Sequence, residues 1–300
     1  MRPVNSVPDA MGPLLGRGAR AEIFEWGENE VLKLFPESTS PLGVEDEARW
    51  TRLVYEAGLP VPGVAGVVAV GGRPGIVYTR VRGQTMGELL LASPSRVSGY
   101  ARRAAELHAR MHSVAAPGLP SQRSVVERKI SRAALPRRHR EAALAVLDAM
   151  PEGQSLCHGD FHPGNIMLPD QGGLPDAVII DWPDASRGNP VADVARTVLL
   201  GRHMHLHAPS CLVACGFSVL ARLFLRTYLR RYAELQSLPL SQLRAWRLPL
   251  AAARLAEGVR SEEKHLAALV EREVRLSNPA SGSSRPGTAV TRGAPRRHTR

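Results

Sequence analysis

Two stretches in the middle of the chain, 158-HGDFHPGNIM-167 and 178-VIID-181, carry most of the information about its fold. In the first stretch, Asp160 and Asn165 stand in the D-x-x-x-x-N spacing that is typical of kinase catalytic loops. In the second stretch, a short apolar run that indicates a buried strand ends in the carboxylate of Asp181. Together they predict a loop and a strand end that supply the polar groups of a phosphoryl-transfer site.

Each of these three side chains suits one role in such a site. The carboxylate of Asp160 can accept or orient the proton of a substrate hydroxyl. The carbonyl oxygen of Asn165 and the carboxylate of Asp181 are hard ligands of the kind that Mg²⁺ prefers, and phosphates and water would complete the coordination. A turn over residues 169–175 would bring these two ligands together at the ends of neighbouring strands. A polar turn followed by an unrelated strand-end carboxylate is the alternative, but the shared order and spacing favour the catalytic interpretation.

The chain before this region is predicted to form a small lobe of strands with one inserted helix. Turn residues separate alternating apolar segments in the pattern of two antiparallel hairpins, and the helix at 44–57 lies between them. The expected strands cover residues 14–25, 30–35, 64–70 and 75–81. A lobe of this composition is a suitable place for a nucleotide.

The chain beyond residue 83 is predicted to be mostly helical. Helical spacing of apolar residues covers 97–113, 127–150 and 191–276, and a short β-like region lies at 155–182. The fold class is therefore α+β, with a small β-rich lobe followed by a larger helical lobe. We place the domains at 1–82 for the N-lobe, 83–276 for the C-lobe and 277–300 for a basic tail.

A nucleotide cradle is suggested by the glycines near the start of the N-lobe. Gly16 and Gly18 lie between strand-like residues and would let backbone amides approach phosphate oxygens. Ala21 replaces the third glycine of the G-x-G-x-x-G pattern, so that a plain hairpin turn is an alternative interpretation of this segment. The glycines therefore support nucleotide binding only in combination with other residues.

Lys33 is the other candidate nucleotide ligand. Lysine is rare in this arginine-rich chain, and Lys33 stands in the middle of an apolar strand, as expected for a lysine that reaches the α- and β-phosphates. A lysine on the solvent face of a strand is the alternative. The inserted helix offers Glu45, Asp46 and Glu47 as an ion partner, and we favour Glu47.

The formal net charge of +11 raises the question of a nucleic-acid partner. Several of the arginines lie in residues 277–300, a stretch without acids and rich in Ser, Gly and Pro, which we expect to be disordered. The other arginines stand beside glutamates in helical segments, without the interleaved aromatic residues of a single-strand binder. We therefore expect no nucleic acid among the partners.

Localisation is predicted from the apolar segments. The most apolar candidate for a membrane span, residues 211–225, contains Gly216, Ser218 and Arg222 and is interpreted as a buried helix. The N-terminus lacks the charged start and apolar stretch of a signal peptide. We expect a cytoplasmic protein with no membrane partner, and the sequence leaves the oligomeric state open.

The two quoted stretches, extended through 182-WPDASRGNPVADVART-197, resemble the aminoglycoside phosphotransferase and choline kinase superfamily, whose fold is similar to that of protein kinases. The resemblance runs over residues 14–276. It implies ATP as co-substrate, Asp160 as the catalytic base, and Asn165 and Asp181 as Mg²⁺ ligands.

The same resemblance implies roles for residues outside the two stretches. Lys33 and Glu47 would be the phosphate-positioning pair, and Asp193 would brace the catalytic loop. Residues 77–81, including Thr79 and Val81, would form the hinge that contacts adenine through its backbone. His158 would be architectural, and His162 is left without a role.

The expected reaction is ATP-dependent phosphorylation of a hydroxyl on a small molecule, as in an aminoglycoside phosphotransferase. Protein substrates are disfavoured because Trp182 and Pro183 follow Asp181, where a protein kinase has Phe and Gly. Asp184 and the glutamates of 257–263 could line an acidic pocket for a polycation, whereas a sugar, nucleoside or anionic metabolite suits the basic surroundings at least as well. A choline, fructosamine or homoserine kinase and a non-catalytic nucleotide-binding regulator are the rival interpretations.

Overall fold

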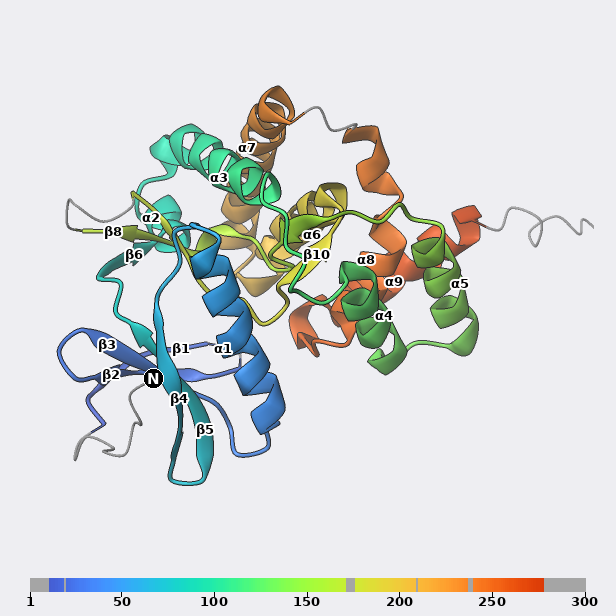
Figure 1. The fold of residues 1–300 in the computed structure, drawn as a ribbon. Helices are drawn as coiled ribbons and strands as arrows, with labels where there is room; N and C mark the ends of the chain where they lie inside the picture. Colours follow the sequence, from blue (N-terminus) through green and yellow to red (C-terminus); the bar gives the residue numbers. More distant parts are fainter. Residues whose placement is uncertain (1–10, 19, 171–175, 209, 237–239, 278–300) are drawn as a thin grey trace, which may run out of the picture.

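The computed structural model describes residues 11–18, 20–170, 176–208, 210–236 and 240–277. Its N-terminal part is a five-stranded antiparallel sheet in the order β1-β2-β3-β5-β4. Helix α1 (Pro41–Glu56) lies along one face of this sheet (Figure 1). The strands are β1 (Leu14–Arg17), β2 (Glu22–Trp26), β3 (Glu30–Leu34), β4 (Val64–Val70) and β5 (Arg73–Thr79).

The face that α1 covers has a small apolar core of its own. Val44 and Ala48 of α1 are buried against Ile76 of β5, as the apolar stripe in the sequence predicts. The segment 14–25 is two strands and not one, because the chain turns between Arg17 and Glu22 to pair β1 with β2. The predicted strand over 14–25 is therefore replaced by β1 and β2, and the lobe is still a sheet with one helix.

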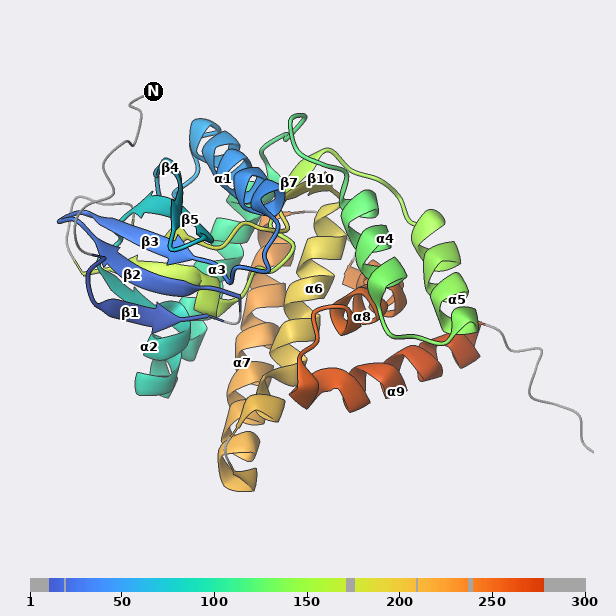
Figure 2. The same ribbon diagram turned by 90° about the horizontal axis from the view of Figure 1, so that it is seen from below.

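The C-terminal part contains the helices in two groups, and each group has an apolar core. The first group packs around the segment that contains the catalytic loop, and α3 and α7 form its most extensive helix pair. It comprises α2 (Met86–Ala92), α3 (Val97–His112), α6 (Pro190–His203) and α7 (Cys211–Leu235). The second group lies on the side of the molecule away from the large sheet (Figure 2). It comprises α4 (Gln122–Arg132), α5 (Arg137–Asp148), α8 (Arg247–Leu255) and α9 (Arg260–Ser277).

Two small sheets carry the predicted catalytic region between these groups. One has the order β6-β8-β9, and in the other β7 pairs with β10. Their strands are β6 (Gly83–Thr85), β7 (Ser155–Cys157), β8 (Ile166–Pro169), β9 (Val178–Ile179) and β10 (Ser186–Gly188). The α+β class with a β-rich N-terminal lobe and a helical C-terminal lobe is confirmed.

Two helix boundaries differ from the sequence-based prediction. The helix expected over 127–150 is the pair α4 and α5, interrupted before Pro136, which cannot continue a helix that precedes it. The helical region expected over 191–276 consists of α6, α7, α8 and α9, with single turns η3 (Met204–His207) and η4 (Leu240–Arg244) between α6 and α7 and between α7 and α8. Ser277 ends α9, and the rest of the predicted basic tail lies outside the described residues.

Helix α7 corrects the expectation of a buried helix at 211–225. Leu220, Phe224 and Tyr228 are buried on one side, whereas Leu212 is 85% exposed and Val219 is 51% exposed. By length and composition, α7 is the one described helix that could cross a membrane, with a mean hydropathy of 1.5, but core helices of soluble proteins pass the same test. The buried side of α7 packs against α3.

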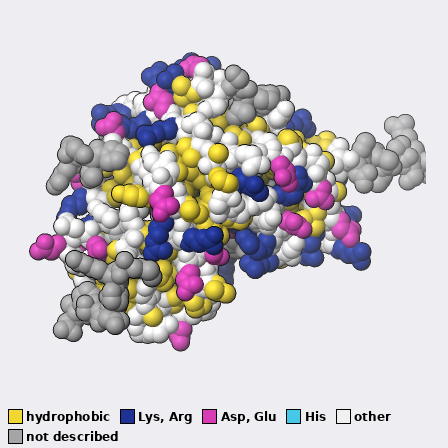
Figure 3. All heavy atoms as spheres, in the orientation of Figure 1, with side chains coloured by type: hydrophobic (Ala, Val, Ile, Leu, Met, Phe, Trp, Pro, Cys, Tyr) yellow, Lys and Arg dark blue, Asp and Glu magenta, His cyan; other side chains and the backbone are white. Residues whose placement is uncertain are grey.

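Charged side chains of both signs are distributed over the face of the molecule drawn in Figure 3. Lys and Arg stand among Asp and Glu on this face, with apolar side chains between them (Figure 3). Many of the arginines form short ion pairs with neighbouring glutamates, such as Arg137 with Glu141 and Arg231 with Glu106. Such exposed pairs add little stability but explain where much of the positive charge is located.

Candidate functional site

The catalytic loop predicted at 158–165 lies between β7 and the single helical turn η2 (Pro163–Asn165). Gly159 has a φ of +80°, and a Cβ at this position would lie 2.7 Å from the Cβ of Asp184. Only glycine fits both the left-handed conformation and the close approach. The buried ring of His158 donates from Nε2 to the carbonyl of Ile180 at 3.1 Å and accepts from the Asp160 amide at Nδ1, so it is architectural in this structure.

Helix α6 holds this loop through three polar side chains within one turn. The carboxylate of Asp193 accepts hydrogen bonds from the amides of His158 and Gly159 at 2.6 and 2.8 Å. Arg196 donates to the carbonyl of Gly159, and Thr197 donates to the carbonyl of Phe161 at 2.8 Å. The backbone of the loop is therefore tied to a single rigid element.

Asp193 also stands at the centre of a buried network with His108 and His112. Nε2 of both rings lies within 3.3 Å of Asp193 Oδ2, and each Nδ1 bonds the hydroxyl of Tyr228 or Tyr232. Burial lowers the pKa of His108 to about 3, so the ring is neutral. The sequence offered no partner acid for the two histidines, because Asp193 lies far from them along the chain.

The ligand atoms of His108, His112 and Asp193 are close enough together to hold a metal ion. Each of these atoms already has a hydrogen-bond partner, however, and all three side chains are buried. A set of groups that satisfies itself in this way needs no ion. We therefore interpret the cluster as a structural network that supports the catalytic loop.

The Asp160 carboxylate lies between a guanidinium and an imidazole. Its Oδ1 lies 3.0 Å from Arg196 Nη2, and its Oδ2 lies 3.6 Å from His162 Nε2. Burial alone would raise the pKa of Asp160, but His162 and the positive charge of Arg196 hold it well below its ordinary value. His162 also accepts a hydrogen bond from the amide of Gly164 at Nδ1, which caps the turn η2. Asp160 is therefore ionised, with one oxygen engaged by Arg196.

Asn165 and Asp181 are brought together by the pairing of β8 with β9. Ile166 lies opposite Ile179 in this ladder, and the amide of Ile180 donates to the carbonyl of Asn165 at 3.0 Å. The side-chain amide nitrogen of Asn165 donates to the carbonyl of Asp160, which leaves the amide oxygen as the atom that a cation would use. Most of the turn predicted over 169–175 lies outside the described residues, but its consequence, the proximity of Asn165 and Asp181, is observed.

Asp181 adopts a backbone conformation that is uncommon for non-glycine residues, although Asp adopts it more often than most. Its φ is +67°, and it is the only non-glycine residue with a positive φ in the described part of the chain. Such a conformation persists where the surroundings enforce it, often at functional sites. The Lys33 ammonium lies 2.6 Å from Asp181 Oδ1 and holds the pKa of Asp181 below its ordinary value, against the effect of burial.

Lys33 joins the two lobes. Lys33 is the penultimate residue of β3, and its ammonium contacts Glu47 Oε1 of α1 and Asp181 Oδ1, at 2.6 Å in both cases. Burial acts to lower the pKa of Lys33, but the two carboxylates outweigh it and keep the lysine protonated. Of the three acids at 45–47, the structure selects Glu47, which also accepts a hydrogen bond from Tyr78 at 3.2 Å. The pair expected from the sequence is thus present, and it is linked to the expected metal ligand.

The remaining candidate nucleotide residues lie at opposite ends of the strands of the large sheet, because Arg17, between the two glycines, is in register with Leu34, whereas Thr79 lies opposite Glu30. Gly16 belongs to β1, and Gly18 donates from its amide to the carbonyl of Ala21 at 2.8 Å in the turn to β2. A Cβ at Gly16 would meet nothing within 4 Å, so the local packing does not by itself require glycine there. Thr79 ends β5, and Val81 lies in the connection to β6. The assignment of these four residues to the nucleotide stays a prediction.

A groove open to solvent lies beside the catalytic loop, between α4, α6 and the turn that joins α8 to α9. It is small, with a cavity volume of about 30 Å³, and its charged lining consists of Lys129, Asp184, Arg196 and Glu257, together with the Asp193 that braces the loop. Lys129 Nζ lies 2.5 Å from Asp184 Oδ2 and 3.0 Å from Glu257 Oε1. The carboxylates that could have formed an acidic pocket are thus already paired with cations.

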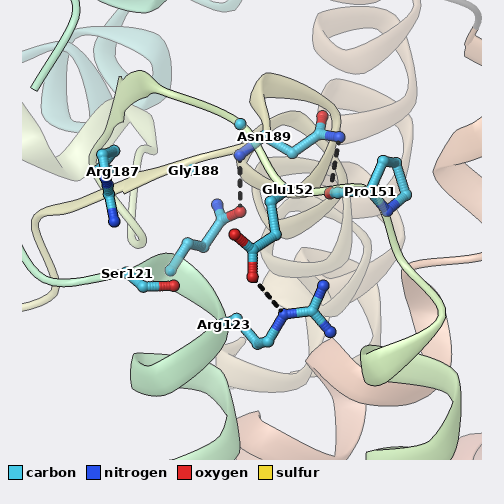
Figure 4. A pocket seen from close by; sticks show the side chains of 9 residues that line it. Ser121, Arg123, Pro151, Glu152, Arg187, Gly188 and Asn189 are labelled. Carbon is cyan, nitrogen blue, oxygen red and sulfur yellow. Dashed lines mark hydrogen bonds and ion pairs between the residues drawn. The ribbon is translucent and has the colours of Figure 1, made fainter.

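A second, polar recess lies between the start of α4 and the segment before α6 (Figure 4). Its lining is joined by internal hydrogen bonds, from the Asn189 amide to Gln122 Oε1 and from Arg123 to Glu152. A Cβ at Gly188 would lie 2.4 Å from atoms of Gln122, so the chain segments are in close contact there. The recess lies apart from Asp160 and Asp181, and we interpret it as a structural joint between helices.

Comparisons with known proteins bear on the family and the fold of the chain. A family model described as the phosphotransferase enzyme family matches residues 15–232, whereas no curated protein matches significantly. A thermostable mutant of aminoglycoside phosphotransferase APH(4)-Ia is 19% identical with a TM-score of 0.60, covering 90% of this chain and 95% of that one. A ternary complex of a thermostable mutant of the same enzyme with AMP-PNP and hygromycin B is 19% identical with a TM-score of 0.59, covering 93% of this chain and 96% of that one. An aminoglycoside-3'-phosphotransferase of type VIII is 20% identical with a TM-score of 0.57, covering 84% of this chain and 91% of that one. At these identities the similarity is one of fold.

Proposed function

The chain belongs to the phosphotransferase enzyme family, and from this membership we propose that it transfers the γ-phosphoryl group of ATP to a hydroxyl group of a small molecule. The observation that carries the proposal is the ion pair between Lys33 and Asp181, with Nζ and Oδ1 2.6 Å apart. It joins a lysine of the β-rich lobe to a carboxylate beside the catalytic loop. A phosphoryl-transfer site needs a phosphate-binding lysine and a metal-binding carboxylate near the same phosphates, and this pair places the two side chains next to each other.

Asp160 is the residue that we propose to orient the acceptor. Arg196 occupies its Oδ1, and His162 Nε2 lies 3.6 Å from Oδ2, beyond hydrogen-bond distance, so Oδ2 is the oxygen that can accept a hydrogen bond from a substrate hydroxyl. The bond that forms joins the acceptor oxygen to phosphorus, the bond that breaks joins phosphorus to the β–γ bridging oxygen, and the hydroxyl proton leaves towards Asp160. Because the transition state of phosphoryl transfer is loose, correct placement of the acceptor contributes more than strong basicity.

The oxygen donors at the strand ends suit a magnesium ion. Asn165 and Asp181 would hold Mg²⁺, which when bound neutralises charge on the phosphates. Lys33 would bind the α- and β-phosphates, and Glu47 would fix its direction. Gly16 and Gly18 would approach the phosphates from β1, and Thr79 and Val81 would border the adenine.

The acceptor class is proposed from the charges that line the groove beside the catalytic loop, to which Gly159 contributes. A polycation would have to compete with Lys129 and Arg196 for Asp184 and Glu257, all of which are already engaged in ion pairs. A neutral or anionic polyhydroxylated acceptor meets no such competition. We therefore rank sugar-like and anionic metabolites above polycationic antibiotics as acceptors. Choline, which is also a cation, is not ranked above either class.

A non-catalytic nucleotide-binding regulator is the rival function. Its strongest support is Ala21, which replaces the third glycine of the loop, but the paired Lys33, Asp160 and Asp181 would be costly to keep without phosphoryl transfer.

The test is a screen of hydroxylated acceptors with Mg·ATP, in three classes: neutral sugars and nucleosides, anionic metabolites, and aminoglycosides. The change Asp160→Asn should lower kcat at least about 100-fold, the scale of a lost acceptor-positioning group, and leave the KM for ATP within about twofold. Retained turnover in Asp160→Asn would sink the mechanism. Wild-type protein that binds Mg·ATP and turns over none of the acceptors, nor water, would favour the regulator.

A further inference from the structure

The buried guanidinium of Arg196 makes contacts that no role discussed so far explains. Its Nη2 lies 3.0 Å from Asp160 Oδ1 and 2.8 Å from each carboxylate oxygen of Glu257. Its Nε donates to the carbonyl of Gly159 at 3.2 Å. The side chain is 5% exposed, so the cation is held between the catalytic loop and the turn that joins α8 to α9.

The shape of this contact requires an arginine. A guanidinium is a planar fork, so one side chain can bond a backbone carbonyl and two carboxylates in fixed directions. The ammonium of a lysine is a compact charge and would not reproduce these directions. Glu257 is itself held by Lys129 Nζ at 3.0 Å and by Arg254. Glu257 therefore holds the guanidinium of Arg196 in place independently of the contact between Arg196 and Asp160.

We propose that Arg196 is a positioning residue of the phosphoryl transfer, which holds Asp160 through Oδ1 so that Oδ2 faces the acceptor hydroxyl. Glu257 completes the device by fixing the guanidinium. The inference rests on the proposed function, because it assigns a task to Arg196 only where Asp160 orients an acceptor.

Physical chemistry supports this division of labour. An unrestrained carboxylate on a loop rotates between several orientations, and a misplacement of about 1 Å can cost about 100-fold in rate. A neighbouring guanidinium makes a carboxylate a weaker base, which would be a disadvantage if the proton had to be removed early. In a loose transition state the orientation of the acceptor matters more than the basicity of the carboxylate. The ion pair with Arg196 therefore restricts the rotation of Asp160 with little loss of catalytic function.

The experiment follows ATP hydrolysis by the full chain with Mg·ATP, with water as the acceptor. For Arg196→Ala we expect kcat to fall about 30- to 100-fold, on the scale of a misplaced catalytic group, with the KM for ATP within about twofold of the wild-type value. Guanidinium ion at about 100 mM should restore kcat at least about fivefold in Arg196→Ala and not in Asp160→Asn, because it refills the cation site. Arg196→Lys should stay below about a tenth of wild-type kcat, because its charge is kept and its geometry is not.

Arg231→Lys is the matched control, since Arg231 also pairs with glutamates, Glu106 and Glu234, but these ion pairs include neither Asp160 nor Glu257. Its kcat should stay within about threefold of the wild-type value, on the scale of a partly exposed ion pair. Arg196→Ala or Arg196→Lys protein that melts like the wild type and keeps kcat within threefold would overturn the inference. Loss of activity without guanidinium rescue would assign a purely structural role instead. If Arg196→Ala does not fold, Arg196→Lys carries the test. Wild-type protein that turns over neither water nor any acceptor of the screen refutes the proposed function itself.

Discussion

The change Asp193→Asn tests whether the buried carboxylate supports the catalytic loop. Asp193 is 1% exposed and accepts four hydrogen bonds, from the amides of His158 and Gly159 and from Nε2 of His108 and His112. Asparagine keeps the shape of the side chain. It removes the charge and replaces one acceptor oxygen with a donor.

The magnitude can be worked from these contacts. In its best orientation the new amide nitrogen takes the place of Oδ1, where it faces the amide of Gly159 and leaves that donor unpaired, at a cost of about 1–3 kcal/mol. The other three hydrogen bonds lose their charged acceptor, at about 1 kcal/mol each. The free energy of unfolding should therefore fall by about 4–6 kcal/mol, a large part of the roughly 5–15 kcal/mol of a typical domain.

The assay is urea or thermal unfolding followed by circular dichroism, in which a loss of this size lowers Tm by about 10–20 °C. Asp148→Asn is the matched control, because it makes the same chemical change on a side chain that is 76% exposed; it should change stability by less than about 0.5 kcal/mol. A loss below about 1 kcal/mol in Asp193→Asn would refute the reasoning. So would a rise in Tm with added zinc in the wild type and not in Asp193→Asn, because the cluster with His108 and His112 would then be a metal site.

Two further predictions concern pH and the nucleotide. The pKa of His108 is about 3 in the folded protein and 6.5 ordinarily, so the unfolded chain binds more protons below pH 6.5, and stability should fall by about 2 kcal/mol between pH 7 and pH 5. His108→Gln should lose that part of the pH dependence, and an unchanged slope in urea titrations would contradict the neutral, buried ring. Lys33→Met should lower kcat/KM for ATP about 10- to 100-fold through the loss of one charge-assisted contact, whereas Lys264→Met, at an exposed lysine of α9, should match the wild type within about twofold. Equal kinetics for the two lysine variants would remove Lys33 from the nucleotide site.

Local patterns predicted most of the fold because the deciding information was itself local. Strand β4 occupies the predicted residues 64–70, since its apolar alternation ends at Gly71 and Gly72, two glycines with positive φ that make the turn. The helix predicted over 127–150 was wrong as one piece, although Pro136 is visible in the sequence, because apolar spacing continues across the break. Exposure of the first half of α7 was also missed, because apolar composition alone does not show whether a partner helix is long enough to cover it.

The site divides in the same way. Asp160, Asn165 and Asp181 could be found because their spacing along the chain reflects the loop and strand pair that hold them. Lys33 and Glu47 could be proposed only after the N-terminal lobe had been predicted as a sheet with one inserted helix. The structure then identified Glu47 among three adjacent acids as the ion partner. The roles assigned to all five in the transfer reaction stay proposals.

Glu257 was expected to line a pocket, but its ion pairs with Arg196 and Lys129 were beyond such reasoning, because the three residues come from the turn after α8, α6 and α4 and meet only when the helices pack. Two clues were nevertheless present. Lys129 is one of few lysines in an arginine-rich chain, and Arg196 follows Asp193 by three residues, which places both on one face of a helix.

The polar face of α6 links the conformation of the helix to that of the catalytic loop. Buried polar side chains are costly unless each finds a partner, and α6 presents Asp193, Arg196 and Thr197 to the interior within one turn. All three are satisfied by residues 158–161 and by Glu257, so the helix and the loop stabilise each other's conformations. A shift of α6 would therefore move the loop backbone and the Asp160 carboxylate together. This coupling explains how an oriented catalytic carboxylate can be placed on a loop without depending on the loop's own stiffness.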